Sequence, residues 1–152
     1  MTGRALFEQI GEIIRGSTPT ALGRPHVHVR SNGVKAWFGD PAPQREHYEA
    51  QIISADIAPG TRTCAIEIGF HAEHRDEPDN QAALAHLLTT ETTWRAELGD
   101  DPVTGPFLGR DTWRRISETW PDPDLDDPDV PFDIGVRLVD YIRALDPHRR
   151  RV

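Results

Sequence analysis

The chain has 152 residues, a length typical of one domain, and we expect a single domain spanning residues 1–152. Hydrophobic residues make up 37% of the chain, which argues against a disordered protein, and no apolar run is long enough to cross a membrane. The formal net charge of −8 works against nucleic-acid binding, because DNA and RNA are polyanions. The amino-terminal segment lacks the apolar centre of a signal peptide, so the sequence predicts a cytoplasmic protein.

The first third of the chain predicts a helix followed by a hairpin. The helix is expected to be capped by Thr2 and to end at Gly16. Its apolar residues recur at helical spacing: Leu6, Phe7, Ile10, Ile13 and Ile14. Two short strands, residues 25–30 and 34–38, are joined by Ser31-Asn32-Gly33, a sequence typical of tight turns.

Two longer strands follow and form the centre of the predicted sheet. We expect the third strand over residues 46–54 and the fourth over residues 63–73, with a Pro59-Gly60 turn between them. Polar and apolar residues alternate along the fourth strand, which indicates one buried face. That face contains Cys64, Ile66, Ile68, Phe70 and Ala72. As the lone cysteine, Cys64 is expected to be a buried small hydrophobe.

The second half predicts a long helix, a fifth strand and a last helix. The long helix is expected to be capped by Asp79 and to end before Gly99. Its leucines should pack on the apolar face of the fourth strand: Leu84, Leu87 and Leu88. The fifth strand is expected over residues 112–118 and the last helix from about Pro131 to Pro147. The predicted fold is therefore α+β, with an antiparallel meander sheet of about five strands and three helices packed mainly on one face.

Several segments resemble a widespread bacterial domain of unknown function. The likeness covers about two-thirds of the chain, in element order as much as in residues. It is carried by residues 47–53, 65–70, 80–99 and 113–117, which include Asn80 at the helix start, Glu97-Leu98-Gly99 at its end and Arg114-Arg115-Ile116 in the next strand. That domain often follows a predicted nuclease module. The resemblance therefore implies the fold and a nuclease-linked or defence-linked context, and it carries over no catalytic residue.

The polar face of the two central strands is the main candidate site. It contains His47, Glu49, Gln51, Glu67, His71 and Glu73. Side chains that face each other across antiparallel strands come within about 5 Å, so histidines and carboxylates there could bind a divalent metal that activates water. A solvent-facing sheet surface is also expected to be polar without any site, and the spacing matches no metal signature.

We therefore expect no stoichiometric metal and no cofactor on this face. If a metal does bind, His47 and His71 should be ligands together with a carboxylate, and a further acceptor should hold each ring.

Other motifs give weaker indications. An endonuclease-like site needs Glu-x-Lys, but the chain has Glu67-Ile68-Gly69. The acidic loop of residues 122–129 begins like a calcium loop, yet Asp127 stands where glycine is required, so we expect a solvated linker. The arginines near the carboxyl terminus form a candidate basic patch: Arg110, Arg114 and Arg115, with a tail at Arg149–Arg151 that is otherwise expected to be solvated.

Two functions remain open after these exclusions. The sequence favours a non-catalytic binding or accessory module whose partner is another protein, with neither membrane nor nucleic acid as its target. The alternative is a small metal-dependent hydrolase that uses the His/Glu face. A face that opens to solvent without any concavity would argue against the enzyme.

Overall fold

A computed structural model of the protein describes residues 3–149, so the predicted cap at Thr2 and the tail residues Arg150 and Arg151 lie outside the described part. The strands are β1 (His26–Val29), β2 (Gly33–Trp37), β3 (Glu46–Ser54), β4 (Cys64–Ala72), β5 (Val103–Phe107) and β6 (Arg110–Pro121). The helices are α1 (Gly3–Ser17), α2 (Glu77–Leu88), α3 (Glu91–Leu98) and α4 (Val130–Arg149), with a short 3₁₀ helix, η1 (Thr20–Leu22).

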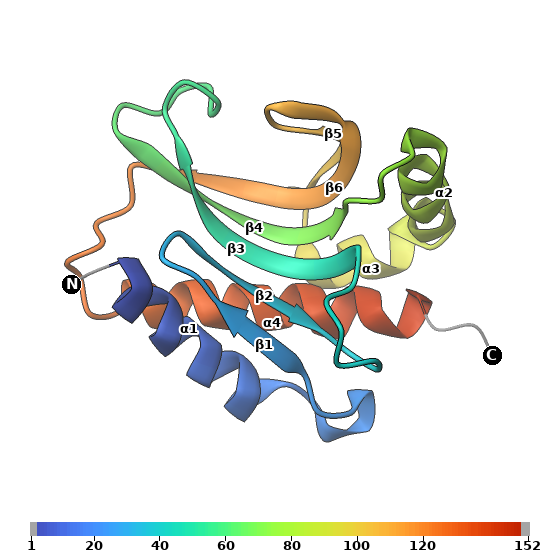
Figure 1. The fold of residues 1–152 in the computed structure, drawn as a ribbon, viewed down its shortest axis with the longest axis horizontal. Coiled ribbons are helices and arrows are strands. Elements are labelled where there is room, and N and C mark those ends of the chain that lie inside the picture. Colours follow the sequence, from blue (N-terminus) through green and yellow to red (C-terminus); the bar gives the residue numbers. More distant parts are fainter. Residues whose placement is uncertain (1–2, 150–152) are drawn as a thin grey trace.

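The strands form one antiparallel sheet in the order β1-β2-β3-β4-β6-β5 (Figure 1). The α+β class is confirmed, but the sheet has six strands rather than about five, and four α-helices are described rather than three. Only the first four strands form a meander, in which each strand pairs with the next one along the chain. The chain then passes through α2 and α3 to the edge strand β5 before β6 returns beside β4.

The missed strand and the divided helix have local causes. β5 has the sequence VTGPF, in which glycine and proline conceal the strand pattern. The predicted long helix divides into α2 and α3 at Thr89 and Thr90, whose hydroxyls donate to the carbonyls of His86 and Leu87. Threonine hydroxyls compete in this way with the helical hydrogen bonds. α2 also begins earlier than predicted, after Asp76.

The last helix also differs slightly from its predicted bounds. α4 begins at Val130 and continues through the exposed Pro147 to Arg149. A proline this close to a helix end removes only one internal hydrogen bond, so the helix can extend past it.

The apolar core lies between the sheet and the helices. α4 lies along β3 and β4, α1 packs on α4 and on the β1–β2 hairpin, and α2 packs mainly against β6 (Figure 1). Ile66, Ile68 and Phe70 share this core with Leu84 and Leu87, as predicted. The prediction was incomplete because the helix lying directly over the central strands is α4. Cys64 and Leu88 are only partly buried.

Gly69 allows β6 to approach β4 closely. Its φ is 155°, and an added Cβ would lie 2.2 Å from the carbonyl oxygen of Ile116. A side chain at this position would therefore force the two strands apart. The close approach brings Arg115 and Ser117 of β6 beside His71 and Gly69 of β4.

Within residues 3–149, no helix combines the length and the apolar character that crossing a membrane requires.

Candidate functional site

The predicted polar face exists, but five of its six residues are buried, and Gln51 is partly buried. Tyr48, Ala50 and Phe70 point into the helix-covered core, so the residues that alternate with them point to the opposite side of the sheet. There β3 and β4 pair His47 with His71 and Gln51 with Glu67. The exposed fraction is 2% or less for His47, Glu49, Glu67 and His71, and 8% for Glu73.

The expectation of a solvent-facing surface is therefore wrong. The physical reason is a second layer of side chains on this face. The ring of Phe107, from β5, stands edge-on to His71 with centroids 4.8 Å apart. Arg30 and Lys35, from the β1–β2 hairpin, reach in from the other side and pair with Glu49 and Glu73.

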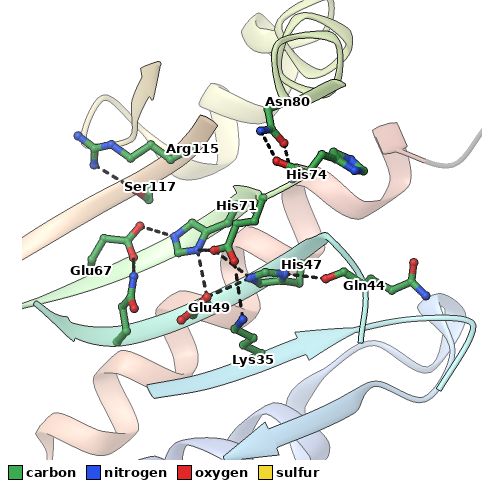
Figure 2. A network of polar contacts seen from close by, with 12 residues as sticks. Lys35, Gln44, His47, Glu49, Glu67, His71, His74, Asn80, Arg115 and Ser117 are labelled. Carbon is green, nitrogen blue, oxygen red and sulfur yellow. Dashed lines mark hydrogen bonds and ion pairs between the residues drawn. The ribbon is translucent and has the colours of Figure 1, made fainter. Parts of the chain in front are cut away.

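Four side-chain atoms converge at the centre of this face (Figure 2). His47 Nε2 lies 2.9 Å from Glu49 Oε1 and 3.4 Å from Glu73 Oε2. His71 Nδ1 lies 3.1 Å from each of the same two oxygens. Ligand atoms of the four residues all lie within 4.8 Å of one another. We call His47, Glu49, His71 and Glu73 the central cluster.

The outward nitrogen of each imidazole ring is also occupied. His47 Nδ1 lies 2.9 Å from the carbonyl oxygen of Gln44. His71 Nε2 lies 2.6 Å from Glu67 Oε2 (Figure 2). The other oxygen of Glu67 accepts from Gln51 Nε2 at 3.2 Å. A carbonyl oxygen can only accept, so Nδ1, the outward nitrogen of His47, carries a hydrogen. A carboxylate oxygen of Glu67 likewise accepts from the outward nitrogen of His71, which is Nε2.

Burial and charge act in opposite directions on the cluster. Burial alone lowers the pKa of His47, but its hydrogen bonds to Glu49 and Glu73 outweigh burial and raise that pKa above its usual value. His71 behaves likewise: burial lowers its pKa, while the charge of Glu67 and hydrogen bonds to three carboxylates raise it strongly.

The carboxylates show the opposite balance. Burial raises the pKa of Glu73, but hydrogen bonds from His47 and His71 lower it in net to about 2. Burial also raises the pKa of Glu49, but hydrogen bonds from His47 and His71 outweigh burial and leave that pKa far below its usual range. The cluster is therefore a set of mutually stabilised charges rather than a row of independent surface groups.

The predicted basic patch is dispersed. Arg114 points to the helix side, where it binds Glu77 and Gln81 of α2. Arg115 is buried on the opposite face and donates to Ser117. Adjacent residues of a strand point to opposite faces, so Arg114 and Arg115 cannot form one patch. Arg110 stacks over the ring of Trp113 at 4.3 Å.

Two other sequence candidates have structural roles. Asp122, the first aspartate of the acidic loop, accepts hydrogen bonds from the backbone of Arg62 and Thr63 and from the Thr63 hydroxyl. It therefore ties the loop to the start of β4. Arg149 is not a solvated tail residue, because its guanidinium pairs with Glu46 and Asp146 and lies over Phe70 at 5.1 Å.

Sequence reasoning missed the residues that enclose the cluster: Arg30, Lys35, Gln44 and Phe107. Lys35 had a usable signal, since it is the only lysine of the chain and lies directly opposite Glu49 once β2 and β3 are paired. The contribution of Phe107 depends on β5, which was not predicted.

The molecule also has surface hollows, and two of them lie beside Glu46 and Arg149. Their volumes are about 430 and 410 Å³, with Phe38 and Gln44 lining the first and His74 and His86 the second. Among the residues described as lining these two hollows, none belongs to the central cluster.

Comparisons of the chain with protein-family models, with curated proteins and with solved structures gave no significant match. The resemblance to the bacterial domain therefore stays a prediction, and the site is interpreted from its own geometry.

Proposed function

We propose that this protein is a non-catalytic binding module that engages another protein. The observation that carries the proposal is an exposed apolar pair on α4 within an acidic surface. Phe132 is 59% exposed and Val136 is 36% exposed. Covering a large exposed apolar side chain with a partner is favourable, and aromatic residues are frequent anchors of protein interfaces.

Charge surrounds this apolar pair. Asp129, Phe132, Asp133 and Val136 recur at the spacing of one helix face, and both aspartates are exposed. The acidic loop immediately before α4 adds Asp126 and Asp127, also exposed. We call these six residues the α4 surface. Its chemistry suits a partner with an apolar pocket and a basic rim, since rim charges of opposite sign speed association and favour the correct partner.

The net charge of −8 favours a protein over a nucleic acid as this partner. A nuclease-linked or defence-linked context, implied by the resemblance of the sequence, is compatible with such a module and belongs to the proposal.

The second candidate, a metal-dependent hydrolase, is favoured by the convergence of two histidines and two glutamates. Burial argues against it. A catalytic metal keeps an open coordination position that substrate can reach, whereas the central cluster is enclosed by Phe107, Arg30 and Lys35.

Affinity capture followed by a binding measurement tests the proposal. The protein is used as bait in the organism that produces it, and the affinity of a captured, purified partner is then measured by calorimetry at two salt concentrations. Phe132→Ser should weaken binding by about tenfold or more, because anchors of this kind contribute at least 1–2 kcal/mol. Higher salt should slow association.

The matched control is Ile57→Ser, which removes an apolar side chain that is 41% exposed in another part of the molecule. Equal binding by both variants and the wild type would contradict the α4 surface as the interface. Turnover of an activated phosphodiester or ester by protein supplied with Zn²⁺ or Mn²⁺, lost in His71→Ala, would support the hydrolase instead.

A further inference from the structure

We propose that the central cluster is a closed, four-ligand binding site for a divalent transition metal, with zinc the best-suited ion. The ligands are His47 Nε2, His71 Nδ1, Glu49 Oε1 and Glu73 Oε2. The site does not depend on the α4 surface, so it can be tested separately from the proposed function.

The first argument concerns lone pairs. The outward nitrogen of His47 donates to the carbonyl of Gln44, and the outward nitrogen of His71 faces Glu67. In a neutral imidazole only one nitrogen carries a hydrogen, so both inward nitrogens would present lone pairs. The oxygens of Glu49 and Glu73 that they face are acceptors as well. With both rings neutral, four acceptors would meet at one place, so the arrangement requires positive charge at its centre, supplied either by ring protons or by a metal ion.

The second argument separates a metal from a set of protons. An N–H hydrogen bond is directional and points best at one acceptor. His71 Nδ1 is instead 3.1 Å from both Glu49 Oε1 and Glu73 Oε2, and His47 Nε2 is also within 3.4 Å of both oxygens. Tetrahedral zinc with bonds of about 2.0–2.1 Å places its ligand atoms roughly 3.3 Å apart. The four nitrogen-to-oxygen distances, 2.9 to 3.4 Å, match four of the six edges of such a shell. The four atoms together lie within 4.8 Å of one another, so the ligands would close in slightly around a bound ion.

The third argument comes from the residues around the ligands. Metal-bound histidines commonly donate their second nitrogen to a carboxylate or a backbone carbonyl, and both forms are present here in Glu67 and Gln44. The outer oxygens of the two ligand glutamates are also held, Glu49 Oε2 by Arg30 and Glu73 Oε1 by Lys35 Nζ at 3.7 Å. Each of the four ligands is thus oriented before any ion arrives.

Burial decides the type of site. All four ligands are at most 8% exposed. Their number equals the coordination number of tetrahedral zinc. Structural zinc sites are closed in this way, while catalytic ones keep a position for water or substrate. Two nitrogens and two oxygens favour zinc over magnesium or calcium, which take six or more oxygen ligands. The ion would join β3 to β4 on the face that the helices do not cover.

The sequence alone predicted no metal here because it treated the face as open to solvent. Burial removes that premise. The conditional part of the expectation named His47 and His71 as ligands with a carboxylate and an acceptor for each ring. The two acceptors are present in Gln44 and Glu67, and the ligand roles remain part of this proposal.

The experiment uses full-length protein stripped with a chelator and then titrated with Zn²⁺ alone, with calorimetry and elemental analysis after gel filtration. We expect one zinc per chain. Co²⁺ in its place should give the intense visible absorption of tetrahedral cobalt. If removal of the metal unfolds the protein, refolding on addition of one equivalent of Zn²⁺ also supports the site. In that case the free energy of zinc binding contributes directly to folding.

Three variants assign the ligands. Glu49→Gln keeps the side-chain shape and should weaken zinc binding by more than about 100-fold, whereas Glu67→Gln, a positioning change, should weaken it by about 10–100-fold. His28→Gln, on the exposed part of β1, is the matched control and should leave affinity unchanged. Folded wild-type protein that binds no zinc, zinc retained equally by Glu49→Gln, or an octahedral cobalt spectrum would each overturn the proposal.

Discussion

The two faces of the central sheet are both buried, but different forces bury them. On the helix side, Ile68 and Phe70 pack beneath α4 in a continuous apolar core. On the other side, His71 and Glu49 lie at equal depth within ion pairs and hydrogen bonds. An apolar face is stabilised by removing area from water, whereas a buried polar face is stable only while every charge keeps its partner. The comparison shows that depth of burial alone does not reveal what stabilises a surface.

The largest effect should come from the apolar face. Ile68→Ala leaves a cavity at a fully buried position and should lower the free energy of unfolding by about 2–5 kcal/mol. The loss should be nearly independent of pH, because no titrating group is removed. Urea denaturation at several pH values measures both features. Ile57→Ala, at an exposed position, should stay within about 0.5 kcal/mol of wild type and controls for the loss of an aliphatic side chain.

A substitution on the polar face should lower stability because it leaves a buried hydrogen-bond donor without a partner, and not because it opens a cavity. Glu67 is fully buried and accepts from His71 and Gln51 through its two oxygens. Glu67→Gln keeps the volume but offers one acceptor oxygen, so one buried donor loses its partner, at a cost of about 1–3 kcal/mol. Urea denaturation of chelator-treated protein measures this loss in the free energy of unfolding. Glu97→Gln, on the exposed surface of α3, is the control, and an equal loss there would remove the distinction between the faces.

The pH dependence of stability should separate the faces further. The raised pKa values of His47 and His71 add stability that is complete below about pH 6.5 and is lost as pH rises through their folded-state values. The lowered pKa of Glu73 adds stability that is present above about pH 4.5 and is lost as pH falls toward 2. Metal-free protein should therefore gain most from the cluster between about pH 4.5 and 6.5.

The change outside that range should not exceed about 1.4 kcal/mol per pH unit for each proton bound or released. Thermal denaturation of chelator-treated protein from pH 3 to 9 measures it. A stability curve that stays flat from pH 6 to 9, in the wild type and in Glu67→Gln alike, would contradict the charged state of the two histidines.

Much of the fold was accessible from the sequence because polar and apolar residues alternate along most of β3 and β4. The alternation identified which residues share a face, and the register then brings together the same histidines and glutamates that the pattern selected. Burial of that face was not accessible. A period of two distinguishes the two sides of a strand, but it does not say whether a second layer covers the polar side. Here that layer comes from Phe107 and Lys35, which are remote in sequence from the strand they cover.

The errors also have separate physical origins. β5 was missed because Gly105 and Pro106 interrupt its pattern, and its absence from the prediction hid the position of Phe107. The basic patch, in contrast, could have been rejected from sequence alone, since Arg114 and Arg115 are neighbours on a predicted strand and must point to opposite faces.

The smallest effect should come from the rim of the polar face. Lys35 lies 3.7 Å from Glu73 Oε1, with its side chain 27% exposed, so water screens part of the attraction. Lys35→Met keeps the apolar stem and removes the charge, and it should change the free energy of unfolding by no more than about 1 kcal/mol. Because salt weakens a partly exposed pair, the difference from wild type should shrink between low and high ionic strength. Urea denaturation at both salt concentrations measures this. A loss as large as that of Glu67→Gln would mean that the lysine is as essential to the buried charges as the carboxylate inside, and the division between centre and rim would no longer hold.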